Sequence, residues 1–323
     1  MRNKLLVSKQ NDSLPDVVFI DPQWLPELVR LDILCILDTQ HDYNEVTEQL
    51  LSGAIETGCR GVHFYGLPFS LTSQLFIYNP QIVTIPSLSF HQINNNSDIY
   101  SLGISEINTA NIIPFLWNNG GELLNIELTK ATGYFNSTNN INSVEMFINS
   151  YKENLIYDST GDQNNLMEMF VSGKIGMIMG DTTFLQSLNE RYPDFIFEVV
   201  HDFPDQKSET ILNSTLLAIP NNENTEISWE IIKVLLSKEV QINFTGFNFI
   251  PANKEAMQSE SFNTDEFSFY IESIQNARAL PNVSSWNEMD NEFSIMMIIK
   301  LEGYISLEQG MNGLANTWDA LLP

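Results

Sequence analysis

Short apolar runs alternate with amphipathic stretches along most of this chain. The runs predict strands, and stretches whose apolar residues recur every three or four positions predict helices. The predicted strands cover 17–20, 62–69, 74–78, 174–179, 195–200 and 216–219, and the predicted helices cover 23–31, 112–118, 143–154, 166–171, 181–191 and 227–236. Residues 80–111 are rich in Asn, Ser and Ile and predict irregular structure. Strands that alternate with helices are typical of an α/β architecture.

Glycine and proline mark the ends of several predicted elements. Gly120 and Gly121 follow the helix predicted at 112–118, and Gly173 follows the helix predicted at 166–171, as expected where a helix ends in a left-handed residue. The chain beyond residue 236 predicts mainly helices, with breaks at Pro251, Pro281 and Gly303.

Charge and length narrow the possible partners. The chain has 323 residues, enough for two lobes, and a formal net charge of −26, largely because Lys and Arg total only 15. We expect no nucleic acid and no anionic lipid as partner, because each is a polyanion. Cationic substrates are allowed by this charge but are not implied by it. The longest apolar runs are far shorter than a membrane-spanning helix requires.

The residue types used in catalysis form no known motif here. The four histidines, His41, His63, His91 and His201, stand apart from one another, and no nucleophile elbow or phosphate-binding loop is present. Cys35 and Cys59 are too few for a disulfide framework or a zinc site. We therefore expect no enzyme, no cofactor and no metal.

The N-terminal sequence does not predict a signal peptide. Arg2 and Lys4 are basic, but no apolar segment of seven or more residues follows them. If the start is genuine, the polypeptide is expected to stay in the cytoplasm.

Seven segments of the chain resemble, in order, segments of one known family. The opening segment is Pro15-Asp-Val-Val-Phe-Ile-Asp-Pro-Gln-Trp-Leu-Pro-Glu-Leu28, which resembles that family's second-strand region. Ile113-Pro-Phe-Leu-Trp-Asn-Asn-Gly-Gly-Glu-Leu123 is similar to a recurrent pattern of the same family. The other similar segments are 65–80, 170–181, 214–237, 249–252 and 306–311. The family that these segments resemble is that of the solute-binding proteins of bacterial sugar ABC importers (the maltose-binding-protein-like family).

This resemblance implies a two-lobe, type II periplasmic-binding-protein-like fold with crossover hinge strands. Residues 1–74 and 204–249 would form the first lobe, and residues 75–203 and 250–323 the second. The first lobe would lack the family's N-terminal strand and most of the following helix. The implied function is carbohydrate binding by hinge closure, with a membrane permease as partner, an extracytoplasmic location and a monomeric state.

The resemblance also implies a set of ligand-binding residues. By position in the family, they are Gln23, Trp24, Thr72, Ser73, Asn108, Asn111, Trp117, Asp181, Thr183 and Trp286, with Phe247 and Asn248 as weaker candidates. Where many members carry a stacking Trp, this chain has Thr183 and Phe184.

Most of these residues also have an ordinary structural interpretation. Trp24 and Trp117 suit helix or core packing, and Asp181 suits a helix cap. Thr72 and Ser73 suit an ordinary strand or turn, and Asn108 and Asn111 suit a loop. A second hypothesis for the whole chain is a degenerate or truncated relative that keeps the fold without a role in transport.

Overall fold

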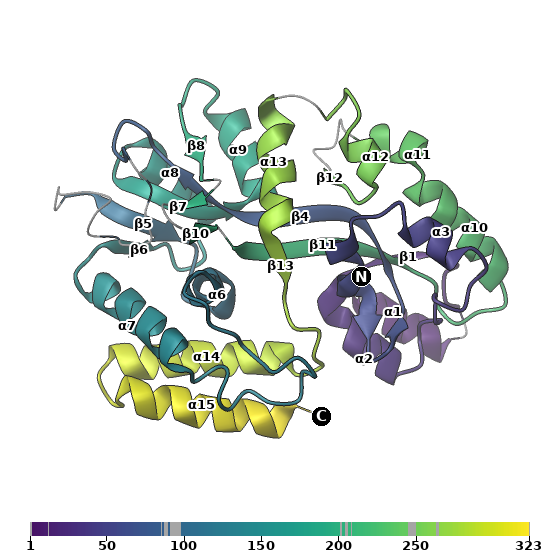
Figure 1. Cartoon of the computed structure of the whole chain (residues 1–323), viewed down its shortest axis with the longest axis horizontal. Helices are drawn as coiled ribbons and strands as arrows, with labels where there is room; N and C mark the ends of the chain where they lie inside the picture. The colour runs from purple at the N-terminus through teal and green to yellow at the C-terminus, as the bar shows by residue number, and fades with distance from the viewer. Residues whose placement is uncertain are drawn as a thin grey trace. The chain divides into compact units, whose positions relative to one another are not determined.

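The computed structural model describes residues 2–11, 13–84, 86, 90, 98–200, 202–203, 206–207, 209–244, 250–262 and 265–322. The chain divides into two compact units, unit 1 (Met1–Thr72 and Leu212–Ser284) and unit 2 (Ser73–Ile211 and Ser285–Pro323). The chain therefore passes from one unit to the other three times, within β4 (Leu67–Tyr78), within β11 (Thr210–Ala218) and between Ser284 and Ser285. Figure 1 shows the elements of both units.

Unit 1 is built on a sheet in which β11 lies between β1 and β4. Strand β1 runs antiparallel to β11, with Val18 opposite Ala218 and Ile20 opposite Leu216. Strand β12 pairs with β4, and β13 pairs with β11. The helices and strands of this unit are α1 (Arg2–Gln10), β1 (Val18–Ile20), η1 (Pro22–Trp24), α2 (Leu25–Arg30), α3 (Tyr43–Thr47), α4 (Ser52–Ile55), η2 (Glu56–Gly58), β2 (Cys59–Arg60), β3 (His63–Phe64), α10 (Thr225–Leu236), α11 (Lys238–Ile242), β12 (Ile250–Pro251), α12 (Lys254–Met257), α13 (Asp265–Asn276) and β13 (Ala277–Ala279).

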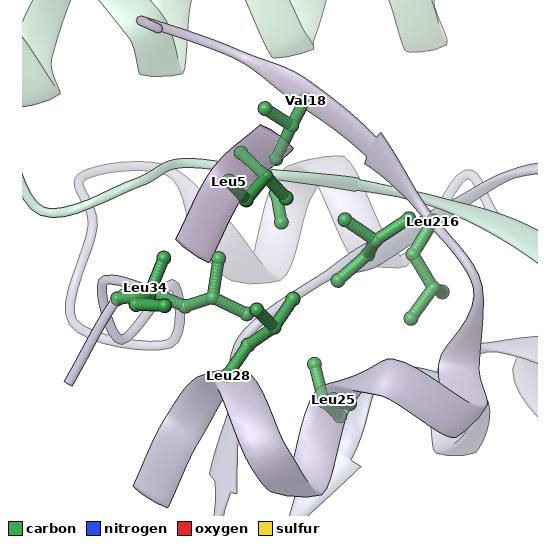
Figure 2. Packing of buried hydrophobic residues seen from close by; sticks show 9 residues of the cluster. Leu5, Val18, Leu25, Leu28, Leu34 and Leu216 are labelled. Atoms are coloured by element: carbon green, nitrogen blue, oxygen red, sulfur yellow. The ribbon is translucent and has the colours of Figure 1, made fainter. Parts of the chain in front are cut away.

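One apolar cluster of unit 1 joins its first helix to its sheet. Leu5 of α1 is 2% exposed and packs with residues of β1, α2 and β11. Figure 2 shows Leu5 beside Val18, with Leu25 and Leu28 projecting from α2 into the same group. An ion pair between Arg2 and Glu27, with 2.5 Å between Nε and Oε2, also ties α1 to α2. Helix α1 is thus part of the hydrophobic core of unit 1.

Unit 2 is built on a mixed sheet in the order β4, β7, β5 and β6. Strand β5 runs parallel to both β6 and β7, whereas β4 runs antiparallel to β7. Helices α14 and α15 lie side by side (Figure 1). The remaining elements of this unit are β5 (Tyr100–Ile104), α6 (Thr109–Asn118), α7 (Thr138–Lys152), β6 (Ile156–Asp158), α8 (Gln163–Val171), β7 (Ile175–Asp181), α9 (Thr182–Arg191), β8 (Glu198–Val199), β9 (Asp202–Phe203), β10 (Gln206–Lys207), α14 (Trp286–Leu301) and α15 (Leu307–Leu321).

Two helices of unit 2 end where glycine predicts. Helix α6 ends at Asn118, and Gly120 follows with a φ of +71°. The amide of Gly120 donates to the Trp117 carbonyl (2.8 Å) and that of Gly121 to the Leu116 carbonyl (2.9 Å). These two bonds form a Schellman motif, which satisfies carbonyls left over at a helix end. Gly173, with a φ of +75°, ends α8 in the same way.

Several predicted elements need correction. The strands predicted at 62–69 and 74–78 are replaced by β3, of only two residues, and one continuous strand, β4. Strands β5 and β6 were not predicted, and β5 lies within the stretch predicted to be irregular. Their short sequences carry little β-branched signal, and pairing with β7 stabilises β5. The strand predicted at 195–200 is reduced to β8.

The predicted lobe boundaries also differ from the units of the structure. Residues 250–284 were predicted in the second lobe but belong to unit 1. Strand β12 pairs with β4 there, with Ile250 opposite Leu71, and helix α12 contacts α11. The break predicted at Pro251 is the end of the short strand β12 in unit 1. The third passage of the chain between the units comes later, after β13.

Candidate functional site

Unit 1 carries a small pocket at the end of strand β1. Its volume is about 70 Å³, room for roughly two water molecules. Four pieces of the chain form its wall: the start of η1, Thr57 of η2, the 212–214 part of β11, and the segment 279–282 that follows β13. The pocket therefore brings together residues that are up to 261 positions apart in the sequence, from Asp21 to Asn282.

The turn after β1 positions Gln23 in this pocket. Asp21 Oδ1 accepts a hydrogen bond from the Gln23 amide (2.8 Å), and Pro22 occupies the first position of η1. An acidic cap and an N-terminal proline both favour a helical turn beginning here. The Gln23 side-chain amide is half-buried, lines the pocket and makes no hydrogen bond to another described residue.

Hydroxyl and amide groups form the rest of the polar wall. Thr57 Oγ1 donates its proton to the Ala54 carbonyl (2.6 Å). In the contact between the two hydroxyls (2.7 Å), Ser214 Oγ is therefore the donor and Thr57 Oγ1 the acceptor. Asn282 Nδ2 donates to the Cys59 carbonyl (2.5 Å), and Arg60 Nη1 donates to the Asn282 carbonyl (2.9 Å). Asn282 Oδ1 is buried and has no hydrogen-bond partner among the described residues. An unpaired buried acceptor is costly unless a ligand or water hydroxyl donates to it.

Unit 2 gathers polar residues at one edge of its sheet. Because β5, β6 and β7 are parallel, their carboxyl ends lie at the same edge, the usual place for ligands in α/β sheets. Glu106 and Asn108 follow β5, Asp158 ends β6 and Asp181 ends β7. We refer to these four residues as the edge set.

Two members of the edge set cap helices. Asn108 Oδ1 accepts from the Asn111 amide at the start of α6 (2.9 Å), and its Nδ2 donates to Glu106 Oε1 (2.9 Å). Asp181 Oδ1 accepts from the Phe184 amide at the start of α9 (2.7 Å). Each side chain thus has a structural role that leaves its remaining lone pairs or protons for other partners.

Asn111 and Gln74 connect the edge set to strand β4. Asn111 Nδ2 donates to Ser105 Oγ (3.0 Å) and to the Glu106 carbonyl (2.8 Å), and its Oδ1 accepts from Gln74 Nε2 (3.2 Å). Gln74 lies opposite Asp181 in the pairing of β4 with β7. Gln74 Oε1 is buried and, like Asn282 Oδ1 in unit 1, lacks a hydrogen-bond partner within the described residues.

Asp158 is the perturbed acid of the edge set. Burial raises its pKa above the usual value, the Thr160 amide that donates to it (2.8 Å) acts in the opposite direction, and the nearby Glu106 raises the pKa further. A raised pKa means that the folded state disfavours the ionised form of the carboxyl group, relative to the unfolded state. Its ionised form therefore destabilises unit 2 at neutral pH.

We expect Asp158→Asn to make the protein more stable than the wild type at pH 7. The Asn Oδ1 can still accept from the Thr160 amide, whereas the buried charge and its repulsion from Glu106 are lost. Because the folded pKa is raised, the wild-type penalty is present above that pKa and fades as the pH falls through it toward the unfolded value of about 3.9. Urea unfolding at several pH values measures the difference in stability between the variant and the wild type. Asp194→Asn, which removes a charge at an exposed position of unit 2, is the control.

Several of the predicted ligand residues are buried. Ser73 is 0% exposed, Asn111 6%, Trp117 4% and Trp286 5%. Trp286 packs near Trp318, with ring centroids 6.3 Å apart, and Trp24 packs on the core cluster of unit 1 without lining its pocket. The packing interpretation therefore describes these aromatic residues in this structure.

The other predicted residues are more accessible. Gln23 lines the pocket of unit 1, and Asn108 and Asp181 belong to the edge set of unit 2. Thr72 is half-buried on β4, and Thr183 is exposed at the start of α9. Phe247 and Asn248 lie outside the described residues.

Sequence reasoning missed most of the polar groups that form these sites. Asp21 had a local signal, because an acidic residue followed by proline directly after a buried strand is typical of a helix cap. Thr57, Ser214 and Asn282 have no such signal, because only the pairing of β11 with β1 and β13 brings them together. Among the described residues, no group of three or more His, Cys, Asp or Glu is arranged to hold a metal ion. No helix in that part of the chain has the length and apolar character needed to cross a membrane.

Solved structures of similar fold are sugar-binding proteins. The sugar-binding protein MalE from Xanthomonas citri superimposes with a TM-score of 0.85, at 18% identity, covering 99% of this chain and 86% of its own. The GacH receptor of Streptomyces glaucescens, solved unliganded and with acarbose, gives a TM-score of 0.81 at 16% identity, covering 99% and 87%. A solute-binding protein from Thermotoga lettingae bound with α-D-tagatose gives 0.78 at 19% identity, covering 99% and 88%. These similarities confirm the predicted two-lobe fold.

The family itself follows from the sequence match. No curated protein sequence matches this chain. The profile of the bacterial extracellular solute-binding proteins, in contrast, matches residues 1–268, well over half of the chain. This protein therefore belongs to the family of bacterial extracellular solute-binding proteins.

Proposed function

We propose that this protein binds a carbohydrate as the solute-binding component of an ABC import system. The observation that carries the proposal is the small polar pocket of unit 1, which Gln23, Ser214 and Asn282 line. The edge set of unit 2, with the unpaired Gln74 Oε1 beside it, offers a second group of polar contacts. Both groups belong to a chain whose fold is that of sugar-binding proteins.

The chemistry of these groups suits a polyhydroxylated ligand. A sugar hydroxyl donates one hydrogen bond and accepts two, and an amide side chain can serve both needs. Gln23, Asn108 and Asn282 are amides, and Asp21 and Asp181 add acceptor oxygens. Acceptors left unpaired in the free protein also discriminate strongly against ligands that lack the matching hydroxyl.

The proposal includes how the ligand is held and delivered. The ligand would be held by hinge closure, with the three passages of the chain between the units as hinges. Gln23, Thr72, Asn108, Asp181 and Thr183 are the predicted contacts that remain in accessible or half-buried positions. The protein would act as a monomer, outside the cytoplasm, with a membrane permease as partner and without covalent chemistry.

Gln23→Ala is expected to weaken sugar binding about tenfold or more without changing the melting temperature. The side chain makes no hydrogen bond to the other described residues, so its loss is expected to remove only ligand contacts. One hydrogen bond to an uncharged ligand is worth about 0.5–1.5 kcal/mol, with a further cost for the ligand group left unpaired. Thermal-shift and calorimetric titrations with a panel of mono- and oligosaccharides, including maltose, tagatose and acarbose, measure the effect. Gln49→Ala removes an exposed glutamine of the same unit that does not line the pocket, and should bind like the wild type.

The same panel tests the rival hypothesis. A ligand that binds only the folded state raises its stability by about 2.7 kcal/mol at a hundredfold excess over Kd. A cooperative melt that no saccharide shifts would contradict sugar binding and favour a relative that has kept the fold without the transport role.

A further inference from the structure

Unit 1 has a second pocket, at the other end of strand β11 from the one described above. The first pocket uses residues 212–214 of β11, whereas the second uses Asn221 and Thr225, beyond the end of that strand. At about 3.3 Å per residue, the stretch from Ser214 to Ala218 alone separates the two ends by about 13 Å. The second pocket has a volume of about 380 Å³, within the range of small-molecule sites.

The walls of this pocket are fixed by the backbone. Leu34 pairs with Pro220 as an isolated bridge, the Cys35 amide donates to the Ile219 carbonyl (2.8 Å), and the Asn221 amide donates to the Ile33 carbonyl (2.7 Å). The Asn221 side chain braces the same loop, because its Nδ2 donates to the Asp32 carbonyl (3.1 Å) and to Asp32 Oδ1 (3.0 Å). A ligand would therefore meet a preformed site, which reduces the ordering that binding requires.

The lining has one charged group and an excess of acceptors. Asp32 is the only ionisable side chain besides Cys35 and Tyr65 among the ten lining residues, none of which is Lys, Arg or His. None of the described residues donates a hydrogen bond to Asp32 Oδ2 or to Gln40 Oε1, and Asp32 is exposed to solvent. Val29, Leu34 and Ile36 add an apolar wall. The lining residues offer an anion no positive side chain, whereas a donor-rich cation with an aliphatic body would match both the acceptors and the apolar wall.

The chain already places one ammonium group beside this pocket. Lys9 Nζ donates to the Asp32 carbonyl (2.7 Å) from helix α1. The Asp32 residue has a φ of +52°, which places it in the left-handed region. Its carbonyl thus accepts from Lys9 and Asn221, while one carboxylate oxygen has no hydrogen-bond donor in the part of the chain that the structure describes. The net charge of −26 further favours cations near such a site.

We propose that this second pocket binds a small organic cation, a primary ammonium carried on a short aliphatic chain. The ammonium donates to the carboxylate of Asp32 and to the amide oxygen of Gln40, and the aliphatic part packs on the wall of Val29, Leu34 and Ile36. This site is separate from the proposed carbohydrate site, so an experiment can contradict one proposal without contradicting the other.

Calorimetric titration of the purified full chain with 1,4-diaminobutane in 100 mM NaCl tests the proposal. We expect one molecule bound per chain, and binding at least tenfold weaker for 1,4-butanediol and for succinate, the neutral and anionic probes of the same carbon number. Asp32→Asn should weaken diamine binding about three- to fivefold, the loss expected when an exposed carboxylate, screened by solvent and salt, loses its charge. The variant should fold, because Asn tolerates the left-handed region and its Oδ1 can still accept from Asn221.

Two comparisons separate this site from general attraction of cations. Glu223→Gln removes an exposed charge near the start of α10 that does not line the pocket, and should bind the diamine within twofold of the wild type. The diamine should also slow alkylation of Cys35, which lines the pocket, and leave Cys59 unaffected. Equal losses in the two variants, equal binding of butanediol, no protection of Cys35, or no binding at all would each overturn the proposal.

Discussion

Leu5→Ala is expected to lower the free energy of unfolding of unit 1 by about 2–5 kcal/mol. Leu5 is 2% exposed and lies in a cluster with residues of β1, α2 and β11 (Figure 2). Truncating a buried leucine loses its transfer free energy and leaves a cavity that the surroundings fill only partly. The loss is expected at the high end if α1 detaches, because the ion pair of Arg2 with Glu27 and the bond from Lys9 to Asp32 would then be lost as well.

Val7→Ala is the matched control for this prediction. Val7 lies on the same helix but is 54% exposed, so its truncation should change the stability by less than about 0.5 kcal/mol. Urea unfolding followed by tryptophan fluorescence measures both variants, because Trp24 packs against the same cluster. Equal stabilities of the two variants would show that α1 does not belong to the core of unit 1.

Strong local signals account for the elements that the sequence predicted well. Helices α6 and α8 end two residues before Gly120 and Gly173, which have a positive φ, and an amphipathic pattern indicated α7, α9 and α10. The missed strand β5 lacks a pattern of its own, since Tyr100–Ile104 contains a glycine and a serine. Gly103 is needed there because an added Cβ would lie 2.7 Å from Leu166 Cδ1, a contact that only the folded unit creates. Tertiary packing thus decides what the local pattern leaves open.

The candidate site was less predictable than the fold for a physical reason. An aromatic residue on a helix has the same sequence signal whether it packs in a core or stacks on a ligand, and Trp117 and Trp286 are both buried in this structure. Gln23 was a candidate because of its position in the family that the chain resembles, and it lines the pocket of unit 1. Asn282 could not, because its role depends on its contacts with Cys59 and Arg60, more than 220 positions earlier in the chain.

Gly58→Ala is expected to destabilise unit 1 by about 3 kcal/mol or more and to weaken ligand binding at the same time. A Cβ on Gly58 would lie 1.9 Å from the Gly66 carbonyl oxygen and 2.7 Å from its carbon. Both atoms belong to the backbone, so no side chain can turn aside, and Gly66 is itself close to Leu216. Forcing a methyl group into such a site requires the backbone to shift, which costs more than repacking of side chains.

The link to binding comes from the neighbours of Gly58. Its carbonyl accepts from the Tyr65 amide (2.9 Å), and the preceding residue, Thr57, lines the pocket and contacts Ser214. A shift of η2 away from β3 would therefore move Thr57 and open the pocket wall. Melting temperature and saccharide titration, measured together, should both fall.

Gly53→Ala, five positions earlier, shows whether this loss is specific to the close approach. Gly53 is an exposed residue of helix α4, and a Cβ there would meet nothing within 4 Å. Alanine favours a helix over glycine by about 0.5–1 kcal/mol, so this variant should be slightly more stable than the wild type and bind equally well. If Gly58→Ala behaved like Gly53→Ala, η2 and the Gly66 backbone would not be in contact, and the pocket wall would not depend on this glycine.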